Sequence, residues 1–326
     1  MIKLTEPITL PVLPPAAQAI AEEMESGKTL GASRNTRQIN DLLCAIVDHW
    51  AGDSGPELGA LIQQVSDYYV TTRGKNTPVI GNALRMVLHG LEPDNGVASL
   101  REFIYAQRAR YNARSIENSK LIGKYGANLL ADCKTIMPFD YSSTMLVILK
   151  TLADRGLHKE LYVLESRVLD GGRPIAKEAA AWGHRIVFTV DMAFCDSLSR
   201  SEAVLIGAES FQADGTVWNT VGSLPIAMFA GEMRVPCYVA TELLKVDTRS
   251  FEGIRKAITP HDYRRVLDYP DSFDNPESVS VTAPDLDAVP PLLISAYITE
   301  QGVLPAGEIY HASKDFALKN GMFTHE

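Results

Sequence analysis

Carboxylates and one arginine follow short apolar segments in the second half of the chain, a pattern suited to acid–base chemistry on a small ligand. They are Asp140 after TIMPF, Glu165-Ser166-Arg167 after LYVL, Asp191 after RIVFTV, Glu209-Ser210 after AVLIGA, and Thr241-Glu242 after CYVA. In open parallel sheets, ligands bind beyond the carboxyl ends of the strands. Each of these residues taken singly is better explained as the cap of a helix or turn. Their convergence on one sheet edge indicates a ligand site.

The elements that would position these residues change in type near residue 124. Before it, apolar residues recur at helical spacing, as in NTRQINDLLCAIVDHW, and a polar, arginine-rich helix is predicted from about Val97 to Tyr125. After it, strands that are apolar throughout alternate with helix-length segments, which indicates a parallel sheet covered on both faces. We therefore predict a helical domain over residues 1–123 and a doubly wound α/β domain over residues 124–326, with a last helix near Pro291–Tyr297.

Composition excludes several classes of protein. The 326 residues carry a net charge of −9, which lacks the basic excess of a nucleic-acid-binding surface, and 46% are hydrophobic, enough for a sizeable core. No apolar run approaches the roughly 20 residues of a membrane helix, and the proline-broken N-terminus makes a poor signal peptide. The four cysteines are scattered without zinc-site spacing. We expect a cytoplasmic protein with free thiols and no metal, membrane or nucleic-acid partner.

Common nucleotide-binding and hydrolase motifs do not occur in the sequence. Gly27-Lys28-Thr29 resembles the end of a P-loop, but that loop needs a glycine where Glu22 stands and a strand where a helix is predicted. There is no GxGxxG, GxSxG or HExxH. We therefore expect no cofactor. Gly171-Gly172-Arg173, at a helix start, could bind phosphate but is also an ordinary turn. His184 is expected on a turn at the solvated surface.

Several of the strand-end segments together resemble one superfamily. It contains the regulatory alpha, beta and delta subunits of initiation factor 2B, ribose-1,5-bisphosphate isomerase and methylthioribose-1-phosphate isomerase. The similar stretches run from about residue 71 to 305: TTRGKNTPVIGNALRMVL, VLESRVLDGGRPIAKEAAAWG, VDMA, VLIGAESFQADGTVWNTVGSLPIA, VPCYVATELLKVD and ITEQGVLP. Their order and spacing carry the resemblance, which agrees with a helical half followed by an α/β half.

The resemblance implies a Rossmann-like second domain, a homodimer or hexamer, and a sugar-phosphate pocket between the domains. It implies that Arg73 contacts phosphate and that Arg167, in ESR, matches the arginine of the family's ESRP. Asn219, in NTVG, matches the asparagine of NKIG, and Lys245 matches the lysine that closes the next strand segment. These types suit the task, because guanidinium forks bind phosphate oxygens bidentately and an amide both donates to and accepts from sugar hydroxyls.

Several positions depart from the isomerase pattern, among them Leu30 in place of the arginine of an RGA segment and Val168 in place of the proline after ESR. Asp140 stands where the isomerases have the cysteine of a THC-type segment, Glu209 replaces the aspartate of GAD, and Thr220 replaces the lysine of NKIG. Two carboxylates can still supply an acid and a base if burial or mutual repulsion keeps one protonated. We therefore predict that Asp140 and Glu209 share these roles in aldose–ketose isomerisation of a sugar phosphate. The substrate would be of the ribose-1,5-bisphosphate or methylthioribose-1-phosphate type.

A non-catalytic function is the competing hypothesis. In it, the chain is a regulatory protein similar to the initiation factor 2B subunits, binding a sugar phosphate or nucleotide without turnover, and the glutamate of GAES favours this alternative. Asp191 matches a family aspartate that would either line the pocket or contact a dimer partner. Trp182 and Trp218 are expected to fill the core or an interface.

Overall fold

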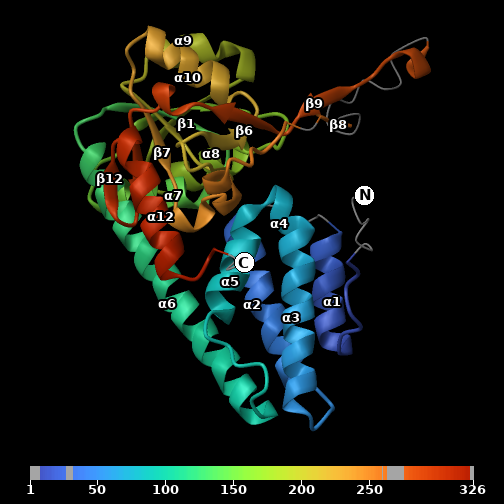
Figure 1. The fold of residues 1–326 in the computed structure, drawn as a ribbon. Coiled ribbons are helices and arrows are strands. Elements are labelled where there is room, and N and C mark those ends of the chain that lie inside the picture. The colour runs from blue at the N-terminus through green and yellow to red at the C-terminus, as the bar shows by residue number, and fades with distance from the viewer. Residues whose placement is uncertain (1–7, 27–31, 259, 263–274, 324–326) are drawn as a thin grey trace. The chain divides into compact units, whose positions relative to one another are not determined.

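Two units of different architecture are built from this chain in the computed structural model, which describes residues 8–26, 32–258, 260–262 and 275–323 (Figure 1). The first unit comprises Met1–Ile116, Leu244–Thr248 and Lys314–Glu326, and the second comprises Glu117–Leu243 and Arg249–Ser313. The first unit therefore also contains two segments from later in the chain. The boundary predicted between residues 123 and 124 instead divides the sequence into two continuous domains, and it stays a prediction.

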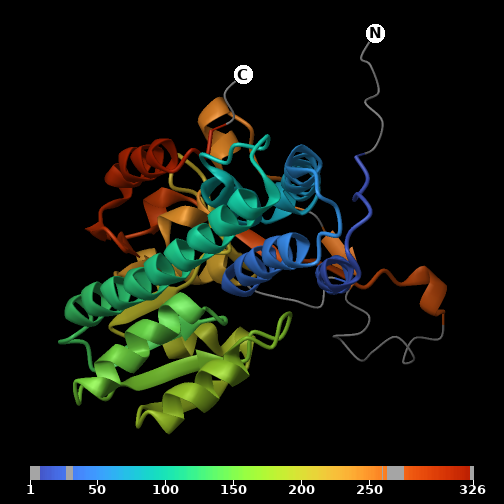
Figure 2. The same cartoon turned by 90° about the horizontal axis from the view of Figure 1, so that it is seen from below.

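Helices dominate the described part of the first unit. Four of them, α1, α2, α3 and α5, stand side by side as a bundle (Figures 1 and 2). The apolar residues that predicted the second helix fill its core, since Ile39, Leu42, Leu43, Ile46 and Val47 are fully buried. The bounds are α1 Pro15–Glu25, α2 Ala32–Asp48, α3 Gly55–Thr71, α4 Arg73–Asn76, α5 Pro78–Leu88 and α6 Val97–Leu129. The long polar helix α6 begins where the sequence predicted and leads into the second unit.

A seven-stranded sheet organises the second unit, in the order β12-β11-β7-β4-β1-β2-β3. All neighbouring strands are parallel except the pair β11 and β12. This is the Rossmann-like strand order, so the predicted fold class is confirmed. The bounds are β1 Thr135–Phe139, β2 Glu160–Leu164, β3 Arg185–Thr189, β4 Ala203–Ile206, β7 Cys237–Ala240, β11 Ala296–Thr299 and β12 Gly302–Leu304.

Helices cover both faces of this sheet because the winding reverses direction. The chain runs outward from β1 to β3, then returns to β4 on the other side of β1 and runs outward again. Right-handed crossovers therefore put α7 and α8 on one face and α9 and α10 on the other. The bounds are α7 Ser143–Asp154, α8 Gly172–Ala181, α9 Phe194–Ser199, α10 Ser223–Glu232 and α12 Ile309–Lys319. The reversal between β1 and β4 is the topological switch point, where sheets of this kind bind ligands.

A smaller antiparallel sheet lies beyond the strand ends, and sequence patterns did not predict it. It has the order β10-β6-β5, with β5 at Ser210–Phe211, β6 at Val217–Thr220 and β10 at Leu286–Val289. A two-stranded pair joins β8 (Pro260–Asp262) to β9 (Thr282–Pro284). The helix predicted near Pro291–Tyr297 is wrong: a short 3-10 turn, Pro291–Leu293, precedes strand β11. Adjacent prolines and the β-favouring AYIT segment explain the difference.

The prediction that His184 lies at the surface is also wrong. The side chain is 5% exposed, and both ring nitrogens are hydrogen-bonded. The backbone N–H of Lys159 donates to Nδ1 at 2.9 Å, so Nε2 carries the proton and donates to the carbonyl of Leu149, also at 2.9 Å. Burial, the largest cause, lowers the pKa of His184; the hydrogen bond to Leu149 opposes this, and the charges of His158 and Lys159 lower the pKa further. The neutral ring thus joins α7 to the start of β2.

No helix in the described ranges is long and apolar enough to cross a membrane.

We expect His184→Gln to reduce the acid sensitivity of folding. The unfolded chain binds a proton at this histidine below pH about 6.5 while the folded chain resists it, so wild-type stability falls as pH drops, by at most about 1.4 kcal/mol per pH unit from this group. Glutamine can keep both hydrogen bonds without taking up a proton. Denaturant unfolding between pH 7 and 5 measures the slope, with the exposed His49→Gln as control. Equal slopes for wild type and His184→Gln would contradict the assignment.

Candidate active site at the carboxyl edge of the sheet

Asp140 lies at the centre of the site, directly after β1 at the switch point of the sheet. Its side chain is 6% exposed, and both carboxyl oxygens accept hydrogen bonds from hydroxyls. Ser166 Oγ donates to Oδ1 at 2.6 Å, and Thr220 Oγ1 donates to Oδ2. These donors come from the end of β2 and the end of β6, so two elements remote in sequence position one carboxyl group.

The backbone around this carboxyl group adopts an unusual conformation. Three of the four non-glycine residues with positive φ in the described part of the chain lie here: Asp140 at 59°, Ser166 at 49° and Asp170 at 53°. Such conformations cost free energy for residues other than glycine and concentrate at functional sites. Asp191, after β3, holds the loop in place, because its two oxygens accept the backbone N–H groups of Ser166 at 2.7 Å and Arg167 at 2.9 Å. Asp191 therefore acts as a backbone clamp within this unit.

Glu209 follows β4, the strand that pairs with β1. Phe139 is the register partner of Ile206, so Asp140 and Glu209 extend from neighbouring strands across the switch point. Strand β6 connects their surroundings: Thr220 bonds Asp140, and the carbonyl of Trp218 accepts the backbone N–H of Glu209 at 2.8 Å. The Glu209 carboxylate pairs with the ammonium of Lys256 at 3.2 Å.

The two carboxyl groups have different electrostatic environments. Burial raises the pKa of Asp140; hydrogen bonds from Ser166 and Thr220 oppose this rise, and the charge of Asp191 adds to it. A raised pKa favours the protonated form, which can donate a proton. Glu209 instead contacts the ammonium of Lys256 and, among the described residues, lacks such neutral hydroxyl donors on both oxygens. Pairs of carboxyl groups in such different surroundings are suited to separate acid and base roles.

The remaining predicted residues of the second unit have distinct surroundings. The Arg167 side chain is exposed, and its guanidinium makes no hydrogen bond or ion pair with the described residues. Asn219 is 6% exposed, and its Nδ2 donates to Ser223 Oγ at 2.9 Å. Glu242, also noted at a strand end, accepts a hydrogen bond from Asn118 of α6 at 3.2 Å. Glu242 is therefore hydrogen-bonded to a helix of the protein.

Arg73 and Lys245 both belong to the helical unit. Arg73 begins α4; its Nη2 reaches Asn35 Oδ1 at 3.5 Å, while its Nη1 is buried without a hydrogen-bond partner among the described residues. A buried unsatisfied donor costs about 1–3 kcal/mol, which makes Nη1 a natural donor to a ligand. Lys245 is 6% exposed, and Asn82 holds it in place by donating to the carbonyls of the flanking residues 244 and 246 at 2.8 and 2.6 Å.

Four residues of the site escaped sequence analysis or were assigned differently. Ser166 and Thr220 bind Asp140, Asp191 clamps the strand-end loop, and Lys256 pairs with Glu209. Ser166 and Asp191 carried a signal because both follow apolar strand segments, and Thr220 was noted only as a departure from the family pattern. Lys256 carried no signal. Among the described residues, no group of three or more His, Cys, Asp or Glu side chains could hold a metal ion.

Comparison with known proteins assigns the chain to a family. A model described as the initiation factor 2 subunit family matches residues 28–306. The ribose 1,5-bisphosphate isomerase of Pyrococcus furiosus is 28% identical over 290 residues, covering 88% of this chain and 89% of that protein. The methylthioribose-1-phosphate isomerase of Rhodopirellula baltica is 30% identical over 276 residues, covering 79% and 76%.

Solved structures show the same fold. The translation initiation factor eIF-2B of Pyrococcus horikoshii OT3 aligns with a TM-score of 0.73 at 20% identity, covering 90% of this chain and 98% of that one. The 5-methylthioribose 1-phosphate isomerase from the same organism aligns with a TM-score of 0.76 at 18% identity, covering 93% and 87%. The fold and the strand-edge site define an α/β protein of the Rossmann-like class joined to a helical unit. Within that class, the chain belongs to the initiation factor 2 subunit family.

We expect Gly171→Ala to damage the site selectively. A methyl group at residue 171 would overlap Oδ1 of Asp140 and crowd the backbone of Tyr141. Overpacking of this kind costs about 1–3 kcal/mol. Thermal unfolding measures the loss, and Gly307→Ala is the matched control, because a methyl group there meets no atom within 4 Å. Equal stability of the two variants would show that the loop does not pack against Asp140 as described.

Proposed function

We propose that this protein is an aldose–ketose isomerase acting on a sugar phosphate of the ribose-1,5-bisphosphate or methylthioribose-1-phosphate type. The observation that carries the proposal is the buried, hydroxyl-bonded Asp140, with its raised pKa, beside the strand that bears Glu209 at the switch point. The curated relatives support the same reaction class, since their names are sugar-phosphate isomerases.

The reaction requires one group that transfers a proton at carbon and a second group that transfers protons at the substrate oxygens. Isomerisation through an enediol-type intermediate removes a proton from the carbon next to the anomeric carbon and later returns a proton to the anomeric carbon. A partner must protonate and deprotonate the substrate oxygens during the same cycle. Asp140 and Glu209 are the proposed pair, because one is buried with a raised pKa and the other carries a paired negative charge.

Cationic and amide side chains are the proposed phosphate and sugar ligands. Arg167 offers an exposed guanidinium and directly follows Ser166, the residue that bonds Asp140. Asn219 supplies an amide from β6, next to Thr220. Arg73 and Lys245 supply cations from the helical unit. That both groups bind the same ligand molecule stays a prediction, as does a cytoplasmic location.

We expect Asp140→Asn and Glu209→Gln each to lower kcat about 10²–10⁴-fold, the usual loss when a general acid or base is removed. The substrate is found by a thermal-shift screen of sugar phosphates and nucleotides, followed by NMR detection of the product. Asp154→Asn is the control, because Asp154 is exposed on α7 and pairs only with Lys150 within the described part of the chain. Wild-type turnover in both site variants would exclude the assigned pair.

The same experiment distinguishes the isomerase function from the competing, non-catalytic regulatory function. Binding of a sugar phosphate or nucleotide without any product identifies a ligand-sensing regulatory protein. Absence of binding to every compound excludes both functions for this site.

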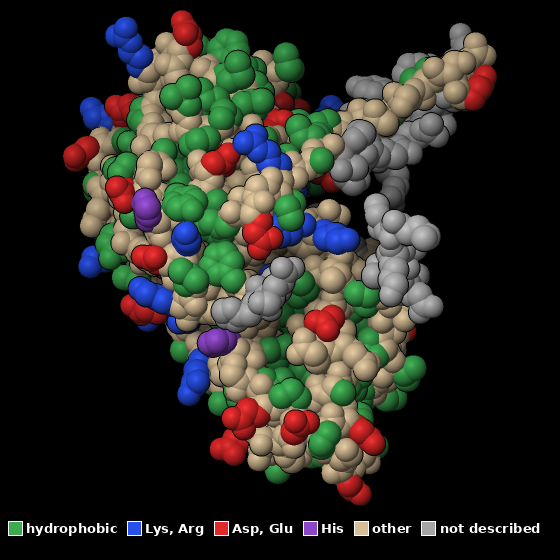
Figure 3. Space-filling view, in the orientation of Figure 1, with side chains coloured by type: hydrophobic (Ala, Val, Ile, Leu, Met, Phe, Trp, Pro, Cys, Tyr) green, Lys and Arg blue, Asp and Glu red, His purple; other side chains and the backbone are tan. Residues whose placement is uncertain are grey.

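We further propose that the chain assembles as a homodimer or hexamer through the second unit. Large hydrophobic side chains are exposed there: Phe188 at 48%, Val190 at 56%, Met192 at 86% and Phe229 at 43%. Phe229 of α10 packs edge-on against Phe194 of α9, which directly follows residues 191–193, so these elements form one apolar surface. Figure 3 shows hydrophobic side chains gathered over the region of α9 and α10. Exposed patches of this kind mark interaction surfaces.

We expect Met192→Glu to shift the protein towards the monomer, because it places a charge in that apolar surface. Light scattering after size-exclusion chromatography measures the mass. Val12→Glu, at a residue that is 94% exposed in the helical unit, serves as the control. An unchanged oligomeric mass would show that the surface around Met192 is not the contact.

A further inference from the structure

Lys256 is a charged residue at the site that no sequence motif indicated. Its side chain is 11% exposed and Glu209 is 25% exposed, so the ion pair between them is largely removed from water. The ammonium also lies 5.5 Å from the ring centroid of Trp218 and 3.5 Å from Ser210 Oγ. Lysine is rarely buried to this extent without a specific charged partner.

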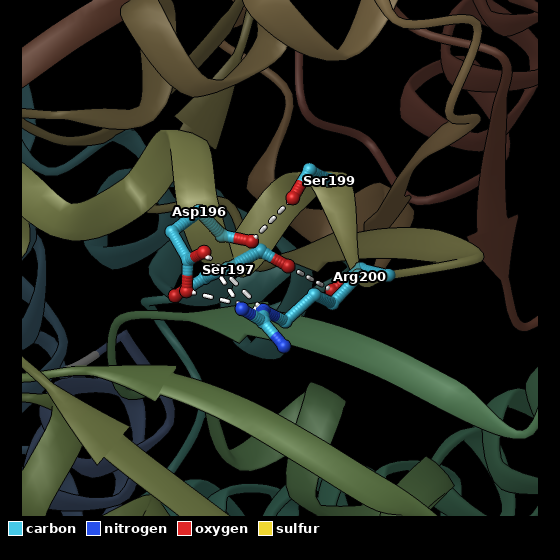
Figure 4. Close-up of polar contacts among 5 residues, drawn as sticks. Asp196, Ser197, Ser199 and Arg200 are labelled. Carbon is cyan, nitrogen blue, oxygen red and sulfur yellow. Dashed lines mark hydrogen bonds and ion pairs between the residues drawn. The ribbon is translucent and has the colours of Figure 1, made fainter.

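Other ion pairs of the second unit differ from this one. Arg200 and Asp196, four residues apart at the end of α9, are 58% and 67% exposed, and the ion pair between them spans one helical turn (Figure 4). Such exposed pairs contribute roughly 0–1 kcal/mol. The Lys256–Glu209 pair instead joins residues 47 positions apart at the carboxyl edge of the sheet. It is therefore placed where it can act on the chemistry of Glu209.

Contacts of the preceding segment hold Lys256 beside Glu209. Ser250, in the short 3-10 helix Thr248–Glu252, accepts a hydrogen bond from the backbone N–H of Ala213 at 2.7 Å. Ala213 follows β5 by two residues, so the segment that leads to Lys256 is anchored beside the small sheet. Trp218, on the partner strand β6, then provides the ring face that the ammonium covers.

We propose that Lys256 is a positioning residue that orients the Glu209 carboxylate as the base for carbon, which leaves Asp140 as the acid for oxygen. This inference rests on the proposed isomerase function. It assigns the base role to Glu209 and the acid role to Asp140, which that function left shared between them. The geometry supports it because the cation contacts Glu209 while Asp140 is bonded by two neutral hydroxyls.

The proton transfers balance with these assignments. Protonated Asp140 gives its proton to the ring oxygen as the bond from that oxygen to the anomeric carbon breaks. Glu209 then removes the proton from the neighbouring carbon, and that electron pair forms the double bond of an enol phosphate. Glu209 returns the proton to the anomeric carbon while Asp140 takes the proton of the enol hydroxyl, which leaves a ketone. Both residues end in their starting forms, with no added oxidant or reductant.

Lys256→Met tests the role directly, because it keeps the length of the side chain and removes its charge. We expect kcat to fall at least 10-fold with KM changed less than about threefold, because the substrate is still bound but proton removal is slower. Lys256→Arg should recover most of kcat by keeping a cation beside Glu209. With substrate deuterated at the reacting carbon, the isotope effect on kcat should be larger in Lys256→Met than in wild type.

A double-mutant comparison shows whether Lys256 acts through Glu209. In the Glu209→Gln background, Lys256→Met should lower kcat less than threefold further, because its partner is already neutral. Arg200→Met removes the exposed control pair and should leave kcat and KM unchanged. Thermal unfolding checks that all variants are folded.

The outcomes separate the inference from the function. If wild type shows no turnover of any sugar phosphate, the isomerase proposal fails and the role of Lys256 fails with it. If wild type turns over its substrate and folded Lys256→Met keeps the wild-type kcat, only the role of Lys256 is overturned. If Lys256→Met raises KM without lowering kcat, Lys256 binds substrate instead of positioning Glu209, which also overturns the inference.

Discussion

The structure of the site depends on one carboxyl group buried at the point where the winding of the sheet reverses. Asp140 is placed there because β1 ends between two neighbours whose connections run to opposite sides. Burial alone would make an unpaired carboxyl group costly. Hydroxyls from β2 and β6, and a backbone loop held by Asp191, satisfy its hydrogen bonds. The surrounding loops therefore converge on this carboxyl group. The positive φ angles of Asp140 and Ser166 show that this convergence requires an unfavourable backbone conformation.

The contrast between two neighbouring carboxyl groups follows from which partners the fold brings to each. Asp140 receives neutral donors and little water, so its proton is retained more strongly. Glu209, one strand away, receives an ammonium group and keeps partial contact with solvent. Strand β6 supports both, since Thr220 bonds Asp140 and Trp218 bonds the backbone of Glu209 and lies under Lys256. A short strand of the small sheet thus couples the two halves of the site.

Much of this arrangement was predictable because it depends on local pattern. Strands that are buried on both faces read as continuous apolar segments, so their ends, and with them Asp140 and Glu209, could be located. The small sheet could not, because β5, β6 and β10 have two to four residues each, and β10 joins β6 from more than sixty positions away. Thr220 and Lys256 depend on that pairing. His184 is buried by contacts with Lys159 and Leu149, which no periodicity in its own segment reveals.

The departures from the isomerase pattern make sense as one linked change. A lysine at position 220, as in the NKIG segment, would set an ammonium beside the residue at position 140 and favour a charged carboxylate there. Thr220 offers a neutral hydroxyl instead, which leaves burial free to raise the pKa of Asp140. A cation, Lys256, lies on a different segment and pairs with Glu209. In the proposed mechanism, the neutral hydroxyls around Asp140 and the cation beside Glu209 therefore suit the first to the acid role and the second to the base role.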